Sequence, residues 1–310
     1  MRDFWRTVPG AAAIAVAVLV AIAAAATFVQ VYRVTHPPRE REAADDLGML
    51  LSGVEEVRFR AADGTVLAGL LFRGRPGEQP IVLGHDLGSG KSSLATLAIA
   101  LQKAGFTVLA LDFRGHGGSG GSRSTLGIEE KRDLIGAVDF LSSVRDADDR
   151  RIGAFGVGLG AHAIALAAAD RPALKVLVLD GRYPDAAFPL VRRVFRGSDF
   201  AVENLGGLPT YLFDAYCRVR SRKEAASAVL PRLVGREILF VAPGGNAELA
   251  AEMQKLFESV PEQRDADASL ITLPATRIGA LYGQEVVRYH RRVVEFFEQR
   301  LARVRAPAEP

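Results

Sequence analysis

The chain has 310 residues, of which 49% are hydrophobic and 24% are charged. This composition supports a buried core and excludes an intrinsically disordered or collagen-like chain. A single cysteine, Cys217, can form neither an internal disulfide framework nor a thiolate zinc cluster. The formal net charge is only +3, with 39 basic residues against 36 acidic ones, so nucleic-acid binding has no electrostatic basis.

An uncharged stretch lies near the start of the chain, from Thr7 to Tyr32. A membrane-spanning helix needs about 20 predominantly apolar residues. Residues 1–36 are therefore predicted to form a single-pass membrane anchor that stands apart from the globular fold, with a linker over 37–53. The alternative is a cleaved signal peptide with Ala24-Ala25-Ala26 as the cleavage site. Arginines flank the stretch at both ends, so the side of the membrane on which the domain lies stays open.

The remainder alternates strand and helix patterns. Two extended segments, 54–60 and 65–72, flank Asp63-Gly64, which is a strong hairpin signal. Further strands are expected at 80–84, 107–111, 151–155, 174–179, 238–241 and 269–273. Helices are expected at 94–104, around 134–141, from about 160, at 247–257 and at 285–303. An antiparallel start followed by βαβ units predicts a mostly parallel sheet covered by helices on both faces. This α/β domain should span 54–303, with 304–310 as a C-terminal tail.

One segment, 186–236, interrupts this alternation and is predicted to form a cap-like insert. From Arg192 to Arg236 it holds nine basic and four acidic residues. Two interpretations are open, namely an ordinary solvated helical surface and a basic cap that rests on anionic lipid beside the anchor. The arginines around Cys217 are expected to lower the pKa of its thiol, although no base pairs with it.

Three loops at the carboxyl ends of expected strands carry the residues of chemical interest. They are Gly84-His85-Asp86-Leu87-Gly88-Ser89-Gly90-Lys91-Ser92, Asp112-Phe113-Arg114-Gly115-His116-Gly117-Gly118-Ser119 and Gly156-Val157-Gly158-Leu159-Gly160. The first ends like a phosphate-binding P-loop, but histidine stands at position 85, where that motif needs glycine. In order and spacing, the hairpin and the three loops resemble the α/β-hydrolase superfamily, and most of all its membrane-anchored, serine-aminopeptidase-like and dienelactone-hydrolase-like branch.

The resemblance implies an α/β-hydrolase fold over nearly all of the chain after the anchor. In that family a serine sits in the middle of Gly-x-Ser-x-Gly, and a histidine and an acid activate it. The positions that match the serine, the acid and the histidine are Gly158, Asn246 and Ile278. Because all three catalytic side chains are lost, the sequence predicts a non-catalytic homologue.

The backbone part of such a site does not depend on these side chains. By the resemblance, an oxyanion hole would use the N–H of Leu159 and that of Asp86 or Leu87. Asp86 stands where the family usually has glycine, and its carboxylate would repel an oxyanion. Together with His85 and the three triad positions, these residues are predicted to form a vestigial pocket. The expected occupant is a small acyl or anionic ligand or a protein partner, with no metal or cofactor.

Two enzymatic alternatives stay open. The first is an active membrane-bound ester or amide hydrolase whose nucleophile lies elsewhere, although His116, His162 and His290 occupy positions typical of packing residues. The second is a dinucleotide-binding oxidoreductase, because Gly156-x-Gly158-x-x-Ala161 follows a strand and the next strand ends in Asp180. That fingerprint usually lies in the first βαβ unit, whereas two strand–helix units precede it here.

Overall fold

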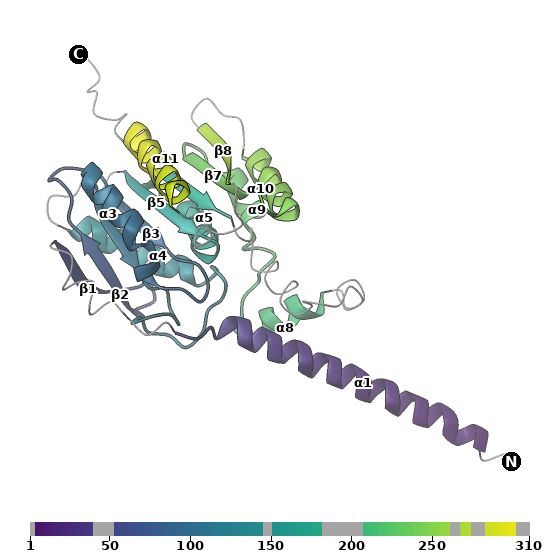
Figure 1. Ribbon diagram of the computed structural model, residues 1–310. Coiled ribbons are helices and arrows are strands. Elements are labelled where there is room, and N and C mark those ends of the chain that lie inside the picture. Colours follow the sequence, from purple (N-terminus) through teal and green to yellow (C-terminus); the bar gives the residue numbers. More distant parts are fainter. Residues whose placement is uncertain are drawn as a thin grey trace.

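A computed structural model describes residues 4–39, 53–144, 151–181, 207–260, 267–273 and 283–301. Its centre is an eight-stranded sheet in the order β1-β2-β4-β3-β5-β6-β7-β8 (Figure 1). The first three strands in this order pair antiparallel and all the others pair parallel. The strands are β1 (Val54–Arg60), β2 (Val66–Phe72), β3 (Pro80–Gly84), β4 (Thr107–Leu111), β5 (Ile152–Val157), β6 (Leu174–Asp180), β7 (Glu237–Pro243) and β8 (Asp267–Leu273).

Local sequence accounts for both parts of the sheet. The β1–β2 hairpin turns at Asp63-Gly64, where the glycine has φ +87° and the Asp63 carboxylate accepts a hydrogen bond from the Thr65 N–H. Strands β3 and β4 are unbroken apolar runs with every residue buried. Such runs are typical of parallel strands with helices on both faces. The predicted sheet, with its antiparallel start, is therefore confirmed.

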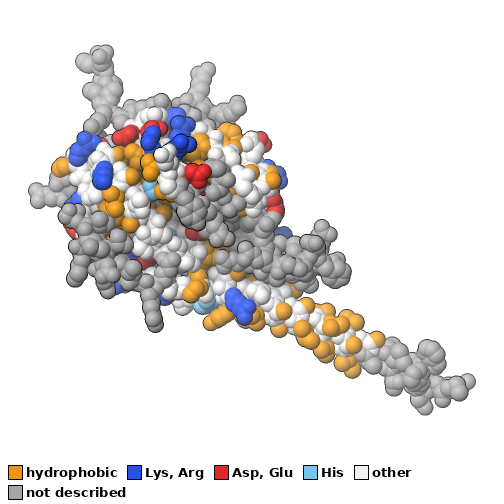
Figure 2. Space-filling model, in the orientation of Figure 1, with side chains coloured by type: hydrophobic (Ala, Val, Ile, Leu, Met, Phe, Trp, Pro, Cys, Tyr) orange, Lys and Arg blue, Asp and Glu red, His pale blue; other side chains and the backbone are white. Residues whose placement is uncertain are grey.

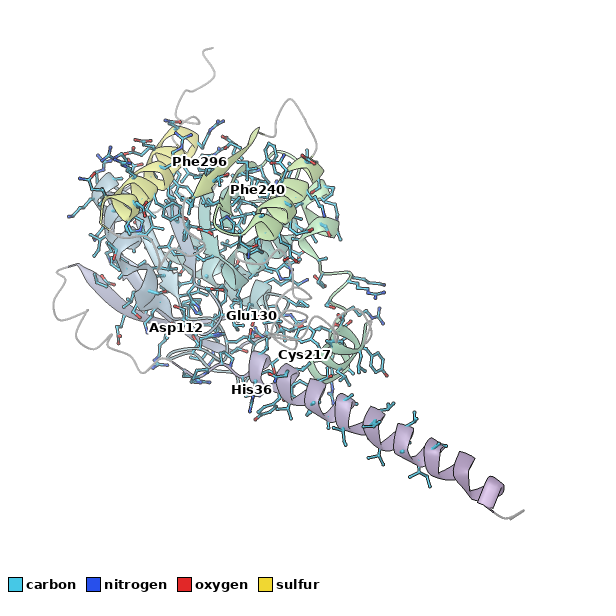
Figure 3. All side chains as sticks on the ribbon, turned by 45° about the vertical axis from the view of Figure 1, so that its right-hand side comes forward. His36, Asp112, Glu130, Cys217, Phe240 and Phe296 are labelled. Carbon is cyan, nitrogen blue, oxygen red and sulfur yellow. The ribbon has the colours of Figure 1, made fainter. Side chains whose placement is uncertain are left out.

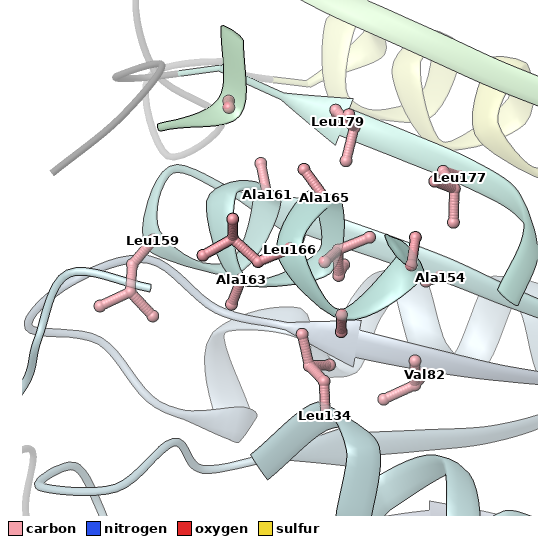
Figure 4. Close-up of a cluster of buried hydrophobic side chains, with 14 of the residues drawn as sticks. Val82, Leu134, Ala154, Leu159, Ala161, Ala163, Ala165, Leu166, Leu177 and Leu179 are labelled. Atoms are coloured by element: carbon pink, nitrogen blue, oxygen red, sulfur yellow. The ribbon is translucent and has the colours of Figure 1, made fainter. Parts of the chain in front are cut away.

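Helices cover the two faces of the sheet in separate layers. On one face lie α3 (Ala95–Ala104) and α11 (Gln284–Leu301), and on the other lie α4 (Glu130–Ser143), α5 (Leu159–Asp170) and α10 (Ala247–Ser259). Shorter helices are η1 (Lys91–Leu94), α8 (Leu208–Cys217), α9 (Ala226–Val229) and η2 (Leu230–Arg232). Helix α5 is the innermost, since its first ten residues are all buried (Figure 4). The helix that follows β5 is thus held by the core along most of its length.

The long first helix, α1 (Phe4–Thr35), projects from this core (Figure 1). Its segment Ala12–Thr35 is long and apolar enough to cross a membrane, as a signal sequence also would be. The prediction that this helix stands apart from the globular fold is wrong at its C-terminal end. Val31, Val34 and Thr35 are at most 2% exposed, and Val31 and Val34 join the same hydrophobic cluster as α5. Because the stretch is apolar on every side of the helix, its sequence does not indicate which side chains face the core.

Several predicted segments lie outside the described residues. They are most of the linker (40–52), the first part of the insert (186–206) and the C-terminal tail (304–310). The described part of the insert contributes α8, which packs along the end of α1, and α9, which packs on α5. Figure 3 shows His36 at the end of α1 and Cys217 on α8 beside it.

Candidate functional site

The tight turn from β5 to α5 forms the centre of the candidate site. Gly158 adopts φ 53° and ψ −108°, a conformation that favours glycine. Gly156 and Gly160 are required for another reason, which is close backbone packing. A Cβ on Gly160 would collide with the backbone of Gly84 in β3, and one on Gly156 would collide with the backbone of Gly160. Strand and helix therefore meet in a sharp elbow that the packing holds in place, and Gly158 offers no side chain to act as a nucleophile.

The carboxylate of Asp86 lies against the elbow. Its Oδ1 accepts a hydrogen bond of 2.7 Å from the Leu87 N–H and a longer one of 3.4 Å from the Leu159 N–H. The resemblance implied the Leu159 N–H as one donor of an oxyanion hole and the N–H of Asp86 or Leu87 as the other, so the Asp86 carboxylate contacts the first and one of the two alternatives for the second. An oxyanion hole works by aiming such donors at the position where negative charge develops. In this chain, a carboxylate oxygen of the protein itself already holds that position.

His85, at the end of β3, serves the backbone of its own loop. The fully buried ring donates from Nδ1 to the Asp86 carbonyl oxygen at 2.7 Å, and its Nε2 accepts from the Phe113 N–H at 3.1 Å. Burial, assisted by the charge of His116, lowers the pKa of His85 to about 3. A neutral ring with both nitrogens committed to the backbone positions the first loop and is not available as a base.

The second loop is organised by buried ionic groups. Lys91 and Asp112 form an ion pair of 2.9 Å, with both side chains at most 3% exposed. The guanidinium of Arg114 reaches the Asp133 carboxylate at 2.7 and 2.9 Å and the Asp63 carboxylate at 2.8 Å. Buried charges are tolerated when they are paired and hydrogen-bonded in this way. These contacts bind the loop to the hairpin and to α4.

His162, in the first turns of α5, is also held by the backbone. Its Nδ1 faces the Leu126 carbonyl oxygen and its Nε2 faces the Glu224 carbonyl oxygen, both at 2.7 Å. The ring thus connects the helix after the elbow to the loop before α4 and to the insert. The ring nitrogens of His116 likewise contact backbone groups, at Gly88 and Arg114.

The remaining predicted positions fall at different places. Asn246 is the N-cap of α10, where its side chain accepts a hydrogen bond from the Leu249 N–H. Ile278 lies outside the described residues. His290 lies on α11, among the residues that line a groove between α11 and α3. All five histidines of the chain fall within the described residues, and no hydrogen bond described there joins one to a serine.

One sequence-based expectation about reactivity is wrong. The thiol of Cys217 is buried, and burial raises its pKa to about 12 although Arg123 acts in the opposite direction. The arginines that follow it in the sequence, Arg218 and Arg220, point to solvent and do not stabilise a thiolate. This cysteine is a packing residue on the buried side of α8.

The surroundings of Asp180 are evidence against the dinucleotide-binding alternative. Its carboxylate accepts a hydrogen bond of 2.8 Å from the Tyr289 hydroxyl and is only 5% exposed, so a ribose could not reach it. The glycine turn also follows the third strand of the parallel part in chain order, not the first. Gly156 and Gly160 serve helix–strand packing, and the oxidoreductase interpretation finds no support.

The described residues near the elbow enclose little empty space. A small apolar cavity of about 20 Å³ lies under α5, α9 and α10, between His162, Phe240 and Met253. It has room for about one water molecule. Within the described residues, no group of three His, Cys, Asp or Glu side chains could hold a metal ion.

Comparisons with known proteins place these features in a family. Residues 11–186 match the family model of the X-Pro dipeptidyl-peptidases (S15 family). This segment includes all three loops and ends before Asn246. Two curated relatives are an uncharacterised protein of Mycobacterium tuberculosis, 37% identical over 131 residues (41% of this chain and 46% of the relative), and a thiohydrolase of Arthrinium phaeospermum, 34% identical over 127 residues (40% and 41%). The chain thus matches less than half the length of either.

Solved structures agree on the fold. An esterase of Pyrococcus furiosus aligns with a TM-score of 0.65 at 19% identity, over 87% of this chain and 99% of the esterase. A dienelactone hydrolase of Anabaena variabilis aligns with a TM-score of 0.56 at 18% identity, over 80% and 99%. At such identities the likeness establishes the α/β-hydrolase fold, which confirms the fold expected from the three loops.

Proposed function

The chain belongs to the X-Pro dipeptidyl-peptidase (S15) family of the α/β-hydrolase superfamily, and we propose that it is a membrane-anchored, non-catalytic member with a ligand- or partner-binding role. The observation that carries the proposal is the contact of the Asp86 carboxylate with the N–H groups of Leu87 and Leu159. An acyl-transfer site must leave these donors to the substrate. Here they donate to a carboxylate of the protein itself, next to a residue without a side chain.

Loss of the base supports the same conclusion. Acyl transfer by a serine needs a histidine within hydrogen-bond reach of the nucleophile. The ring nitrogens of His85, His116 and His162 contact backbone groups. His290 lies on α11, two turns beyond the start of the helix, and His36 lies at the end of α1. Three of the five are thus engaged elsewhere, and no hydrogen bond within the described residues joins any of the five to a serine.

The ligand of this vestigial site must suit the filled oxyanion hole. A small acyl or anionic ligand would have to displace the Asp86 carboxylate before it could reach the N–H groups. A ligand or protein segment that itself donates a hydrogen bond meets that carboxylate as an acceptor without any displacement. We therefore favour a donor group on the ligand or on the partner that binds here.

Anchoring to the membrane by α1 is the second part of the proposal. An 18-residue stretch of the helix within Ala12–Thr35 has a mean hydropathy of 2.7, and its side chains from residue 12 to residue 22 are exposed. Apolar side chains cover the visible side of α1 (Figure 2). A helix that is apolar all round and not covered by protein is suited to a lipid environment.

The catalytic part is tested on the full chain purified in detergent. Short-chain nitrophenyl esters measure turnover, and a fluorophosphonate probe labels any activated serine in the same sample. We expect neither turnover nor labelling. Gly158→Ser should stay inactive too, because Asn246 and Ile278 provide neither an acid nor a base. A labelled serine mapped to this chain by mass spectrometry, with saturable turnover, would overturn the proposal.

A further inference from the structure

The junction of α1 and α8 gathers aromatic side chains. Tyr216 of α8 meets the ring of Phe28 edge-on at 5.4 Å and lies 6.3 Å from the ring of Tyr32. His36 stacks on Tyr32 with the ring centres 4.1 Å apart. Tyr211, on the outer side of α8, is 70% exposed. Tyrosines of this kind are enriched where a membrane protein crosses the headgroup region.

The length of α1 places this junction at the membrane surface. Twenty positions separate Arg6 from Thr27, which is the first buried residue among the side chains of α1 that the structure describes and is followed by Val31 and Val34. At about 1.5 Å per residue they span about 30 Å, which is the thickness of the hydrocarbon core. If this stretch fills the core, Phe28 to His36 and the docked α8 lie at the level of the headgroups.

The end of α8 and the turn after it are basic. Arg218, Arg220, Arg222 and Lys223 are all exposed. The two acidic residues of this segment are only partly exposed. The Asp214 carboxylate accepts a hydrogen bond from the Ser221 N–H, and Glu224 forms an ion pair of 3.0 Å with Lys131. The charged side chains of this segment that are classed as exposed are therefore all basic.

The end of α1 is also hydrogen-bonded to the loops at the edge of the sheet where the elbow lies. The Ser124 N–H donates to the Thr35 carbonyl oxygen at 2.7 Å. The Arg39 guanidinium donates to carbonyl oxygens of the loop after β4, at Ser119 (2.8 Å) and at Gly121 (2.6 Å). The loops that surround the elbow thus lie on the side of the domain from which α1 leaves.

We propose that α8 and the turn after it (208–223) form a membrane-apposed surface that binds anionic phospholipid headgroups. The proposal rests on the membrane anchoring proposed above. Exposed tyrosines provide interfacial contact and the four basic side chains provide charge complementarity. Of the two interpretations open for the basic insert, the structure favours the lipid-facing one, because α8 is held against the end of the anchor.

The test uses the full chain with one tryptophan as a reporter. Trp5 is the only native tryptophan, so Trp5→Phe with Tyr211→Trp leaves a single one on α8. The protein is reconstituted into phosphatidylcholine vesicles that contain a fixed fraction of brominated lipid, either zwitterionic or anionic phosphatidylglycerol. We expect brominated lipid to quench this tryptophan, and the anionic form to quench it more strongly. One basic side chain near the surface enriches an anionic lipid about fivefold.

Matched variants make the result specific. Trp5→Phe with Val287→Trp reports from α11, where Val287 is 56% exposed, and should not be quenched. Replacing Arg218, Arg220 and Arg222 by glutamine should abolish the preference for anionic lipid. Replacing three exposed arginines of α11, at 288, 291 and 292, should leave it unchanged.

Alkaline carbonate extraction of the same vesicles distinguishes failure of the lipid-binding proposal from failure of the anchoring proposal. Retention of the protein without quenching at residue 211, or quenching without a preference for anionic lipid, would overturn the lipid-binding surface and leave the anchoring intact. Release of the protein into the supernatant would overturn the anchoring, and this inference with it.

Discussion

Replacement of Asp86 is the perturbation that tests the filled oxyanion hole most directly. Asp86→Asn keeps an oxygen acceptor for the two N–H groups but removes the charge. A hydrogen bond to a charged group contributes about 1.5–3 kcal/mol, against about 0.5–1.5 kcal/mol for a neutral one. Because the Leu159 contact is long at 3.4 Å, most of the loss should come from Leu87. We expect about 1–2 kcal/mol in total, which lowers Tm by about 2–8 °C in a domain of this size.

Asp86→Gly goes further, because it removes the acceptor and leaves both donors directed at an open position. A carboxylate ligand could then take the place of the side chain. Two charge-assisted hydrogen bonds of about 1.5–3 kcal/mol each correspond to a Kd near 1 mM before any other contact is counted. At 10 mM hexanoate such an affinity adds about 1.4 kcal/mol of stability, or about 3–6 °C in Tm. Wild-type protein should show no shift.

Thermal unfolding of the full chain in detergent, followed by circular dichroism, measures both effects. Asp139→Asn is the control, since Asp139 lies on the exposed face of α4 in an ion pair with Arg171. It removes the same charge far from the elbow. Equal stabilisation of wild type and Asp86→Gly by hexanoate, or none in the glycine variant, would refute the reasoning.

Three further outcomes follow from contacts described above. The folded-state pKa of His85 is lowered from 6.5 to about 3, so the neutral ring contributes fully to the free energy of unfolding above pH 6.5. As the pH falls from about 6 to 3, stability should decrease by about 1.4 kcal/mol per pH unit, which urea titrations measure. Arg114→Met leaves the Asp133 carboxylate buried without its partner and should cost about 3–5 kcal/mol in the free energy of unfolding. Val31→Ala should cost about 1–2 kcal/mol, whereas Val29→Ala, at a 47% exposed position, should cost almost nothing in the same measurement.

A specific result would contradict each of these three predictions. His85→Gln should flatten the acid slope, and an unchanged slope would assign it to other groups. Arg132→Gln, which breaks an exposed ion pair with Glu129, is the control for Arg114→Met and should cost less than about 1 kcal/mol. Equal losses for Val31→Ala and Val29→Ala would mean that the end of α1 does not pack on the domain in solution.

Much of the sheet could be predicted from local patterns. Strands β3 and β4 begin and end at the predicted residues, because each is a short and predominantly apolar run. Strand β5 runs two residues further than predicted, to Val157, since Gly156 pairs with Leu179 in spite of its loop-like composition. A glycine that pairs in a sheet and a glycine that turns the chain look alike in a sequence.

The site was predictable in its positions but not in its contacts. The sequence indicates that Gly158 replaces a nucleophile and that Asp86 is an unusual residue beside the hole. It does not indicate that the carboxylate would reach the Leu159 N–H, 73 positions away. The same limit explains the error at Cys217, where burial of the thiol raises its pKa in spite of the arginines that neighbour it in the sequence. Contacts of both kinds depend on tertiary packing.

Because α1 packs on the domain, the orientation of the domain relative to the membrane also depends on bilayer thickness. Transmembrane helices tilt when their apolar length exceeds the local hydrocarbon thickness. Val31 and Thr35 are buried in the domain and Arg39 is hydrogen-bonded to it, so tilting of the helix must rotate the domain as well. A thinner membrane would incline the whole body and a thicker one would bring it upright. The height of the elbow above the lipid would then be a property of the host membrane as much as of the protein.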